Sequence, residues 1–181
     1  MKRLASAIAF ACAIASTAGP ATAGGGLVYE LKGGILGHDV PDLWSGFQLE
    51  RDAADINLEV MFRPGLPFLG GVIRPAVGGT FNLRGDTSHG YIDARWQYET
   101  IWGLYFGVGL GAAIHDGHLA PDSDFHKALG SRLLFHIPAE VGFRFDRHNS
   151  LSLYFEHTSN AYTQDFNEGM DRMGIRYGYR F

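Results

Sequence analysis

Apolar side chains recur at every second position along much of this chain, and this period of two restricts its fold more than any other feature. In residues 101–114 every even position is apolar, whereas the odd positions are mostly glycine. Residues 129–145 and 171–181 repeat the alternation, with apolar residues at the odd positions. A period of two is typical of β-strands that bury one face. The pattern therefore predicts an all-β fold.

Eight segments carry this alternation, and turn-forming residues separate them. The polar residues 115–127 are predicted to form a long loop, and residues 37–54 are ambiguous between a loop and a loop with a strand extension. The alternating segments predict eight strands, with hairpins as the repeating unit. They are residues 27–36, 55–63, 72–84, 90–99, 101–114, 129–145, 149–160 and 171–181.

Residues 1–23 have the pattern of a secretory signal peptide. Lys2 and Arg3 precede an apolar stretch, and residues 21–23 (Ala-Thr-Ala) fit a small-x-small cleavage site. The stretch is too short to span a bilayer, which takes about 20 apolar residues. A buried N-terminal helix is the alternative. Cleavage would leave one exported domain, residues 24–181.

The composition of the exported domain excludes several functional classes. Cys12 is the only cysteine and lies in the signal peptide, so disulfides, thiol catalysis and zinc–thiolate sites are not expected. Loss of Lys2 and Arg3 leaves 13 basic residues against 19 acidic ones, a net charge of −6. Such an acidic chain is not expected to bind nucleic acid. The mean hydropathy of −0.05 is unlike that of a helical membrane protein.

The two faces of the predicted strands differ in a way that favours a membrane barrel. One face is apolar and aromatic, and the other combines glycines with charged residues. Ion pairs and glycines fit the narrow interior of an eight-stranded barrel, whereas an apolar belt fits lipid. The aromatic end at Phe181 resembles the C-terminal signature of bacterial outer-membrane proteins. The charged residues assigned to the interior are Glu59, Arg63, Arg74, Arg84, Asp93, Arg95, Glu99, Arg132, Glu140, Glu156, Arg176 and Arg180.

We therefore expect an eight-stranded antiparallel transmembrane β-barrel of the bacterial outer membrane, with a soluble barrel as the alternative.

Some short motifs carry little weight in a chain of this predicted fold. The glycines of residues 107–111 have no following helix, so a dinucleotide loop is not expected. Residues 84–86 (Arg-Gly-Asp) fit a turn. His115 and His118 could touch a metal ion, but spacing fixes no third ligand, and His136 is expected to face the interior. No metal or cofactor is predicted.

Three polar residues interrupt the apolar faces of the last two predicted strands. His157 and Ser159 are two positions apart and share a face, which lets an imidazole reach a hydroxyl and act as its base. Asp171 opens the next strand, and hairpin pairing can bring it beside His157 to hold the second ring nitrogen. By parity all three face lipid in a barrel. Polar groups are costly in hydrocarbon, so they call for a functional explanation.

The predicted depth of these residues points to a substrate. If Phe181 marks the periplasmic end, the ten residues back to Asp171 span about 25 Å of a tilted strand. The three residues would then lie near the outer leaflet. An enzyme with its active site there should act on outer-leaflet lipid, which in Gram-negative bacteria is lipid A.

Residues 157–161 (His-Thr-Ser-Asn-Ala) followed by Asp171 resemble the PagL family of lipid A 3-O-deacylases, which are acyloxyacyl hydrolase-like proteins. The family motif is His-x-Ser-Asn-Ala in the penultimate strand, with an acidic residue fourteen positions after the His. The resemblance implies that Ser159 is the nucleophile, His157 the general base and then acid, and Asp171 the residue that orients His157. It also implies an oxyanion hole formed by Asn160 and the backbone N–H of Tyr162.

Two positions depart from the family pattern. Asp171 stands where the family has glutamate, one methylene longer, and Glu168 is an alternative acid. Tyr162 stands where the family has glycine. The resemblance implies a serine esterase acting on lipopolysaccharide among outer-membrane lipids, without a cofactor, and is compatible with a homodimer. The alternatives are a structural or adhesive barrel without catalysis and, less favoured because of the filled interior, a transport pore.

Overall fold

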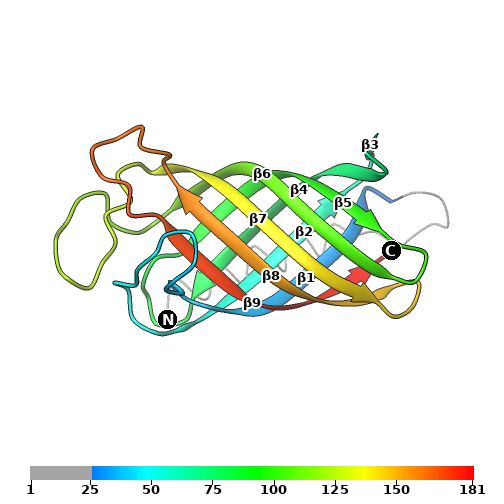
Figure 1. Cartoon of the computed structure of the whole chain (residues 1–181), viewed down its shortest axis with the longest axis horizontal. Helices are drawn as coiled ribbons and strands as arrows, with labels where there is room; N and C mark the ends of the chain where they lie inside the picture. The colour runs from blue at the N-terminus through cyan, green and yellow to red at the C-terminus, as the bar shows by residue number, and fades with distance from the viewer. Residues whose placement is uncertain (1–25) are drawn as a thin grey trace.

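The computed structural model describes residues 26–181, so the predicted signal peptide and its cleavage site lie outside the described residues. Within this range the chain forms an antiparallel β-barrel (Figure 1). No described helix is long and apolar enough to cross a membrane. The strands are β1 (Val28–Gly37), β2 (Ala54–Phe62), β3 (Leu66–Phe68), β4 (Gly71–Asn82), β5 (His89–Glu99), β6 (Leu104–His115), β7 (Leu133–Arg144), β8 (Asn149–Ser159) and β9 (Met170–Arg180).

Eight of these strands close the barrel, which confirms the predicted fold class. β9 pairs with β1, and β2 pairs directly with β4. The short β3 forms a hairpin with β4, and β3 itself lies outside the closed ring. Within the ambiguous residues 37–54, Gly37 ends β1 and Ala54 begins β2, and residues 38–53 between them form a loop rather than a strand extension. Residues 129–132, predicted as strand, also lie in a loop.

The two ends of the barrel differ in the length of their connections. The long loops 38–53, 83–88, 116–132 and 160–169 gather at one end, opposite the C-terminus and the short turns 100–103 and 145–148 (Figure 1). Short periplasmic turns and longer extracellular loops are typical of outer-membrane barrels. We refer to the long-loop end as the outer end.

The alternation divides the side chains as predicted. In β6 most even residues are exposed, with 51% for Val108 and 59% for Leu110, whereas Tyr105 is fully buried in the interior. Exposed apolar residues recur along the outer faces of several strands, as expected of a barrel surface that contacts lipid rather than water.

Ion pairs and aromatic rings fill the interior. Glu140 lies at its centre, with its Oε2 atom 2.7 Å from Lys32 Nζ, 3.2 Å from an Arg95 nitrogen and 3.0 Å from an Arg176 nitrogen. The Arg176 guanidinium also stacks on the Tyr154 ring. Because charges removed from water need close partners, this network makes each of its members depend on the others.

Three arginines do not take the predicted interior position. Arg63 and Arg84 lie in connections and are hydrogen-bonded to backbone carbonyls, and Arg132 lies in the loop that precedes β7. The period of two ends with the strands, so parity does not orient side chains beyond them.

Replacement of Glu140 by glutamine is expected to destabilise the barrel by about 3–5 kcal/mol, because it leaves several buried cations without their anion. The matched change Glu99→Gln removes a carboxylate whose side chain is 28% exposed and should cost only about 1 kcal/mol. Thermal unfolding in detergent, followed by heat-dependent gel mobility, measures both. Equal losses in the two variants would contradict the central role of Glu140.

Candidate active site

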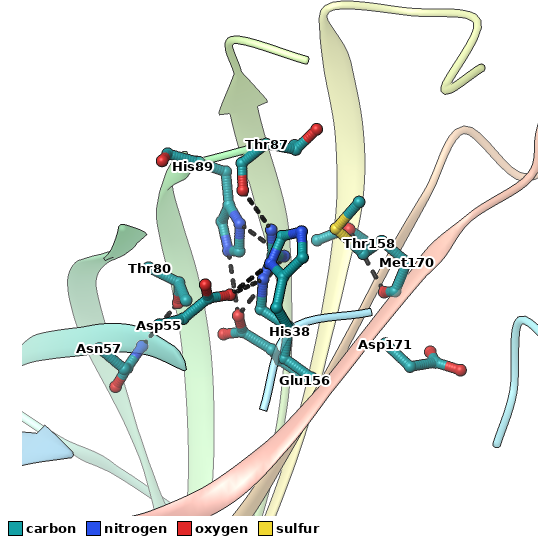
Figure 2. Close-up of polar contacts among 12 residues, drawn as sticks. His38, Asp55, Asn57, Thr80, Thr87, His89, Glu156, Thr158, Met170 and Asp171 are labelled. Atoms are coloured by element: carbon teal, nitrogen blue, oxygen red, sulfur yellow. Dashed lines mark hydrogen bonds and ion pairs between the residues drawn. The ribbon is translucent and has the colours of Figure 1, made fainter. Parts of the chain in front are cut away.

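The three polar residues meet where β8 ends and β9 begins, at the outer end of the barrel. The β8–β9 register places His157 directly opposite Asp171. Ser159 follows His157 on the same face, outside the barrel wall. Glu156, the neighbour of His157 in sequence, points into the interior instead. Figure 2 shows Asp171 pointing away from the side chains of Asp55, His38 and Glu156.

A continuous line of hydrogen bonds joins the three side chains. His157 Nδ1 lies 2.6 Å from Asp171 Oδ1, and His157 Nε2 lies 3.0 Å from Ser159 Oγ. An ionised carboxylate only accepts hydrogen bonds, so Nδ1 is the protonated ring nitrogen and Nε2 can accept the serine proton. We refer to Ser159, His157 and Asp171 as the triad. Its geometry suits an imidazole that deprotonates a hydroxyl.

The triad faces outward, as predicted, but the loop 38–53 covers it. Only 5% of His157 and 8% of Ser159 is exposed, and Asp171 is fully buried. Trp44 stacks on the His157 ring with 4.5 Å between ring centroids and an angle of 10°. The backbone N–H and the hydroxyl of Ser45 both donate to Asp171 Oδ2, at 2.5 and 2.9 Å. The covering loop thus shields polar groups that would otherwise face hydrocarbon.

A buried lysine fastens this covering loop to the loop between β6 and β7. Lys127 Nζ lies 2.7 Å from Asp39 Oδ1 and donates to Phe47 O at 2.7 Å and to Ser45 Oγ at 3.3 Å. Asp39 in turn accepts the backbone N–H groups of residues 49 and 50 through Oδ2. The charge on Lys127 therefore holds the segment that contacts Asp171.

A second attachment holds the covering loop to the barrel rim. His38 lies between Asp55 and Glu50, 2.8 Å from each carboxylate. Burial opposes ionisation of Glu50, but hydrogen bonds from His38 and Thr87 outweigh it and hold the pKa of Glu50 at about 2. Burial likewise opposes charge on His38, yet the hydrogen bonds to Asp55 and Glu50 raise the pKa of His38. Both shifts favour a charged pair at the base of the loop.

The two residues expected to form an oxyanion hole differ in their surroundings. The side-chain amide nitrogen of Asn160 donates hydrogen bonds to the carbonyls of Leu129 and Phe166, at 2.9 and 2.5 Å. Asn160 therefore fastens adjacent loops in this conformation. Tyr162 has a φ of 60° and lies next to Ala161, with a φ of 53°. Tyr162 thus adopts a backbone conformation that glycine accepts more readily.

Glu168, the alternative acid, lies elsewhere. Its Oε2 atom accepts the backbone N–H of Ala128 at 2.5 Å, and its own N–H donates to Ala128 O. The next residue, Gly169, has a φ of 62°, and a Cβ there would lie 3.1 Å from His157 Cε1 and 3.6 Å from the Ser45 Cβ. Gly169 therefore lets the loop pass close to the imidazole.

The weaker sequence motifs do not join this site. The glycines of residues 107–111 lie within β6, where no helix follows. His115 Nε2 lies 2.6 Å from Ser131 O, whereas His118 contacts Asp122. His136 faces the interior, as predicted, between Asp93 and Glu156.

Sequence reasoning missed the residues that surround the triad from the loops. Trp44, Ser45 and Lys127 all contact the triad or its partners, yet none lies in a segment with a periodic pattern. The available signal was compositional. Trp44 and Phe47 are large aromatic residues in a connection, where polar residues are usual.

Comparison with known proteins assigns the family. Residues 77–180, more than half of the chain, match the family described as lipid A 3-O-deacylase (PagL). No curated protein sequence matches the chain. The crystal structure of the outer membrane enzyme PagL is similar, with a TM-score of 0.61, 17% identity, and coverage of 83% of this chain and 99% of that one.

Two further structures are more distant. A de novo designed transmembrane β-barrel has a TM-score of 0.48 at 12% identity, covering 87% of this chain and 100% of its own. The outer membrane protein Ail of Yersinia pestis has a TM-score of 0.47 at 15% identity, covering 84% and 99%. The family match gives the family, and the PagL crystal structure has the same barrel fold. On that basis the chain is a β-barrel of the bacterial outer membrane and belongs to the PagL family of lipid A 3-O-deacylases.

Proposed function

We propose that this chain hydrolyses the 3-O-linked acyl ester of lipid A, with Ser159 as nucleophile, His157 as general base and acid, and Asp171 as the residue that orients His157. The observation that carries the proposal is the line of hydrogen bonds from Ser159 Oγ through the imidazole to Asp171 Oδ1. Its position outside the barrel wall, at the outer end, supports a substrate that arrives from the outer leaflet. The family match supports the same ester.

The reaction follows from the roles of the three groups. Ser159 Oγ attacks the ester carbonyl while its proton passes to His157 Nε2. The tetrahedral intermediate collapses, the bond to the 3-oxygen of lipid A breaks, and His157 protonates that oxygen. Water then attacks the acyl–Ser159 ester with His157 again as base, which releases a fatty acid and restores the serine. Asp171 holds the imidazole and stabilises its charged form throughout.

The tetrahedral oxyanion needs hydrogen-bond donors. Because the side-chain N–H groups of Asn160 are held by two carbonyls, we assign the backbone N–H of Tyr162 as the main donor. Asn160 would then keep the loops around this N–H in place, and would donate to the oxyanion only after it releases a carbonyl. The left-handed φ of Tyr162 supports this assignment, since the backbone keeps a glycine-like conformation despite the substitution.

Ser45 is proposed to compensate for the short acidic residue. Asp171 uses one oxygen for His157 and the other for the two donors of Ser45, so its carboxylate is held from both sides. A hydrogen bond to a charged group is worth about 1.5–3 kcal/mol. The hydroxyl of Ser45 therefore acts as a positioning group for the triad.

Replacement of Ser45 by alanine is expected to lower kcat about tenfold with little change in KM, because the backbone N–H contact remains while the hydroxyl contact is lost. Ser45→Thr keeps the hydroxyl and should restore most of the rate. The control Gln48→Ala changes an exposed hydrogen bond to Asp52 in the same loop and should have no effect. Equal activity of the alanine and threonine variants would contradict the role of this hydroxyl.

The test of the proposed function is the mass spectrum of lipid A from Gram-negative cells with and without the full chain. We expect a species lighter by one acyl chain, together with the corresponding free fatty acid. An unaltered lipid A profile from cells that contain the folded barrel would favour the alternative, a structural or adhesive barrel.

Two further properties belong to the proposal. Residues 1–23 would be removed on export to leave the domain 24–181, which N-terminal sequencing of the membrane form would establish. Chemical crosslinking in the membrane would give a crosslinked pair of chains if the protein is a homodimer, and no such product if it is a monomer.

A further inference from the structure

A cluster of metal-ligating side chains lies in the loop between β6 and β7, separate from the triad. His118, Asp122 and His126 are spaced four residues apart, and their ligand atoms lie within 4.8 Å of one another. Each histidine offers Nδ1 to a different oxygen of the same carboxylate. The distances are 2.7 Å from His118 to Oδ2 and 3.2 Å from His126 to Oδ1.

The rings of the two histidines are arranged to share one cation. They stack in parallel, with 4.2 Å between centroids and an angle of 3°. Two imidazolium rings in this arrangement would repel each other, whereas two neutral rings can direct their Nδ1 lone pairs to a common point beside Asp122. Each ring can move its proton to Nε2. The side chains are 35–44% exposed, so an ion can enter.

We propose that His118, Asp122 and His126 form a binding site for a divalent transition-metal ion, with Zn²⁺ as the best match. Two imidazoles and one carboxylate are typical zinc ligands, and three protein ligands leave a fourth position for water. Ligands of a tetrahedral zinc lie about 3.3 Å apart, given bonds of about 2.0–2.1 Å. The three ligand atoms already lie within 4.8 Å of one another, so a small adjustment of the loop would bring them to this spacing. Ca²⁺ and Mg²⁺ prefer oxygen ligands and should bind poorly.

A second cluster of similar composition in the barrel interior is a poorer candidate. His89, His136 and Glu156 also bring ligand atoms within 4.8 Å. However, Arg172 donates to His89 Nδ1 at 3.1 Å, and an arginine cannot accept a proton from that ring. His89 Nε2 must then carry the ring proton, which blocks it as a ligand. Among the described residues, no arginine contacts the rings of His118 and His126. The Ser123 hydroxyl lies 3.0 Å from His126 Nδ1, but a hydroxyl can donate or accept and so leaves that nitrogen free to bind an ion.

A metal ion at this site would also affect the covering loop, residues 38–53. His126 precedes Lys127, whose ammonium holds Asp39 and Ser45 in the segment above the triad. An ion that fixes residues 118–126 would therefore reduce the freedom of the Lys127 contact. The binding itself requires no catalytic residue, so it stands apart from the proposed function.

The experiment is a Zn²⁺ titration of the purified full chain in detergent, without a histidine tag, in competition with a chromophoric zinc chelator. We expect one site per chain, weakened at least tenfold in the double variant His118→Ala/His126→Ala. His148→Ala removes an exposed histidine in the turn at the opposite end and should leave the affinity unchanged. A millimolar excess of Ca²⁺ or Mg²⁺ should not displace the zinc.

Three results would overturn the proposal. The double variant could bind zinc as tightly as the unaltered chain, the unaltered chain could fail to compete with the chelator, or His157→Ala could abolish binding while the double variant does not. The last result would place the ion at the triad. Heat-dependent gel mobility of every variant checks that the barrel is folded. If the folded double variant binds zinc more weakly, Asp122→Asn should also bind it more weakly.

Discussion

Replacement of Ser159 by alanine is expected to reduce release of the 3-O-linked acyl chain by about a thousandfold or more. The variant keeps the barrel and the His157–Asp171 pair but has no hydroxyl to form the acyl intermediate. Loss of a triad nucleophile in serine hydrolases leaves only the rate provided by binding and oxyanion contacts. Quantitative mass spectrometry of lipid A in detergent micelles measures the release directly.

The matched control for this experiment lies on the same strand. Ser150 is also a serine of β8 but points into the interior, where its hydroxyl makes one long contact of 3.4 Å with Glu30. Ser150→Ala should retain nearly full activity. If Ser159→Ala releases fatty acid at the rate of Ser150→Ala, Ser159 is not the nucleophile. Unchanged heat-dependent mobility of both variants separates loss of chemistry from loss of fold.

The fold could be predicted because the barrel wall obeys one period. Alternation in β6 assigned Leu104 and Val108 to the outer surface, and their exposure agrees. The same parity placed His157 and Ser159 on one face, and hairpin pairing brought Asp171 opposite His157. The face that a side chain takes and its partner across a hairpin follow from strand geometry alone, and the alternating pattern of the sequence is enough to predict both.

The loops could not be predicted in the same way, because their contacts have no period. Nothing in the sequence indicated that Ser45, 126 residues before Asp171, would donate two hydrogen bonds to it. The prediction that polar groups would face lipid was therefore incomplete, since Trp44 and its loop cover them. Side-chain amides pose a similar problem. The motif indicates Asn160, but only the folded loops show that its N–H groups are engaged.

Replacement of Asp171 by asparagine is expected to lower activity by about 10³–10⁴-fold, close to the effect of losing the nucleophile. The amide has nearly the same shape, so the β8–β9 pairing should remain. It carries no charge, however, and can offer an N–H to His157 Nδ1. The imidazole would then place its proton on Nε2, where it can no longer accept the proton of Ser159.

The same substitution at Glu168 identifies the acid of the triad. Glu168→Gln keeps a carbonyl oxygen that can accept the Ala128 N–H, and Glu168 makes no hydrogen bond to His157 among the described residues. Its activity should therefore fall less than about threefold, within the range of a peripheral change. A large loss in Glu168→Gln with a small loss in Asp171→Asn would reverse the assignment. Since Asp171 lies directly opposite His157 in the β-ladder and Glu168 lies in the preceding loop, the two variants test whether strand register or loop conformation supplies the catalytic carboxylate.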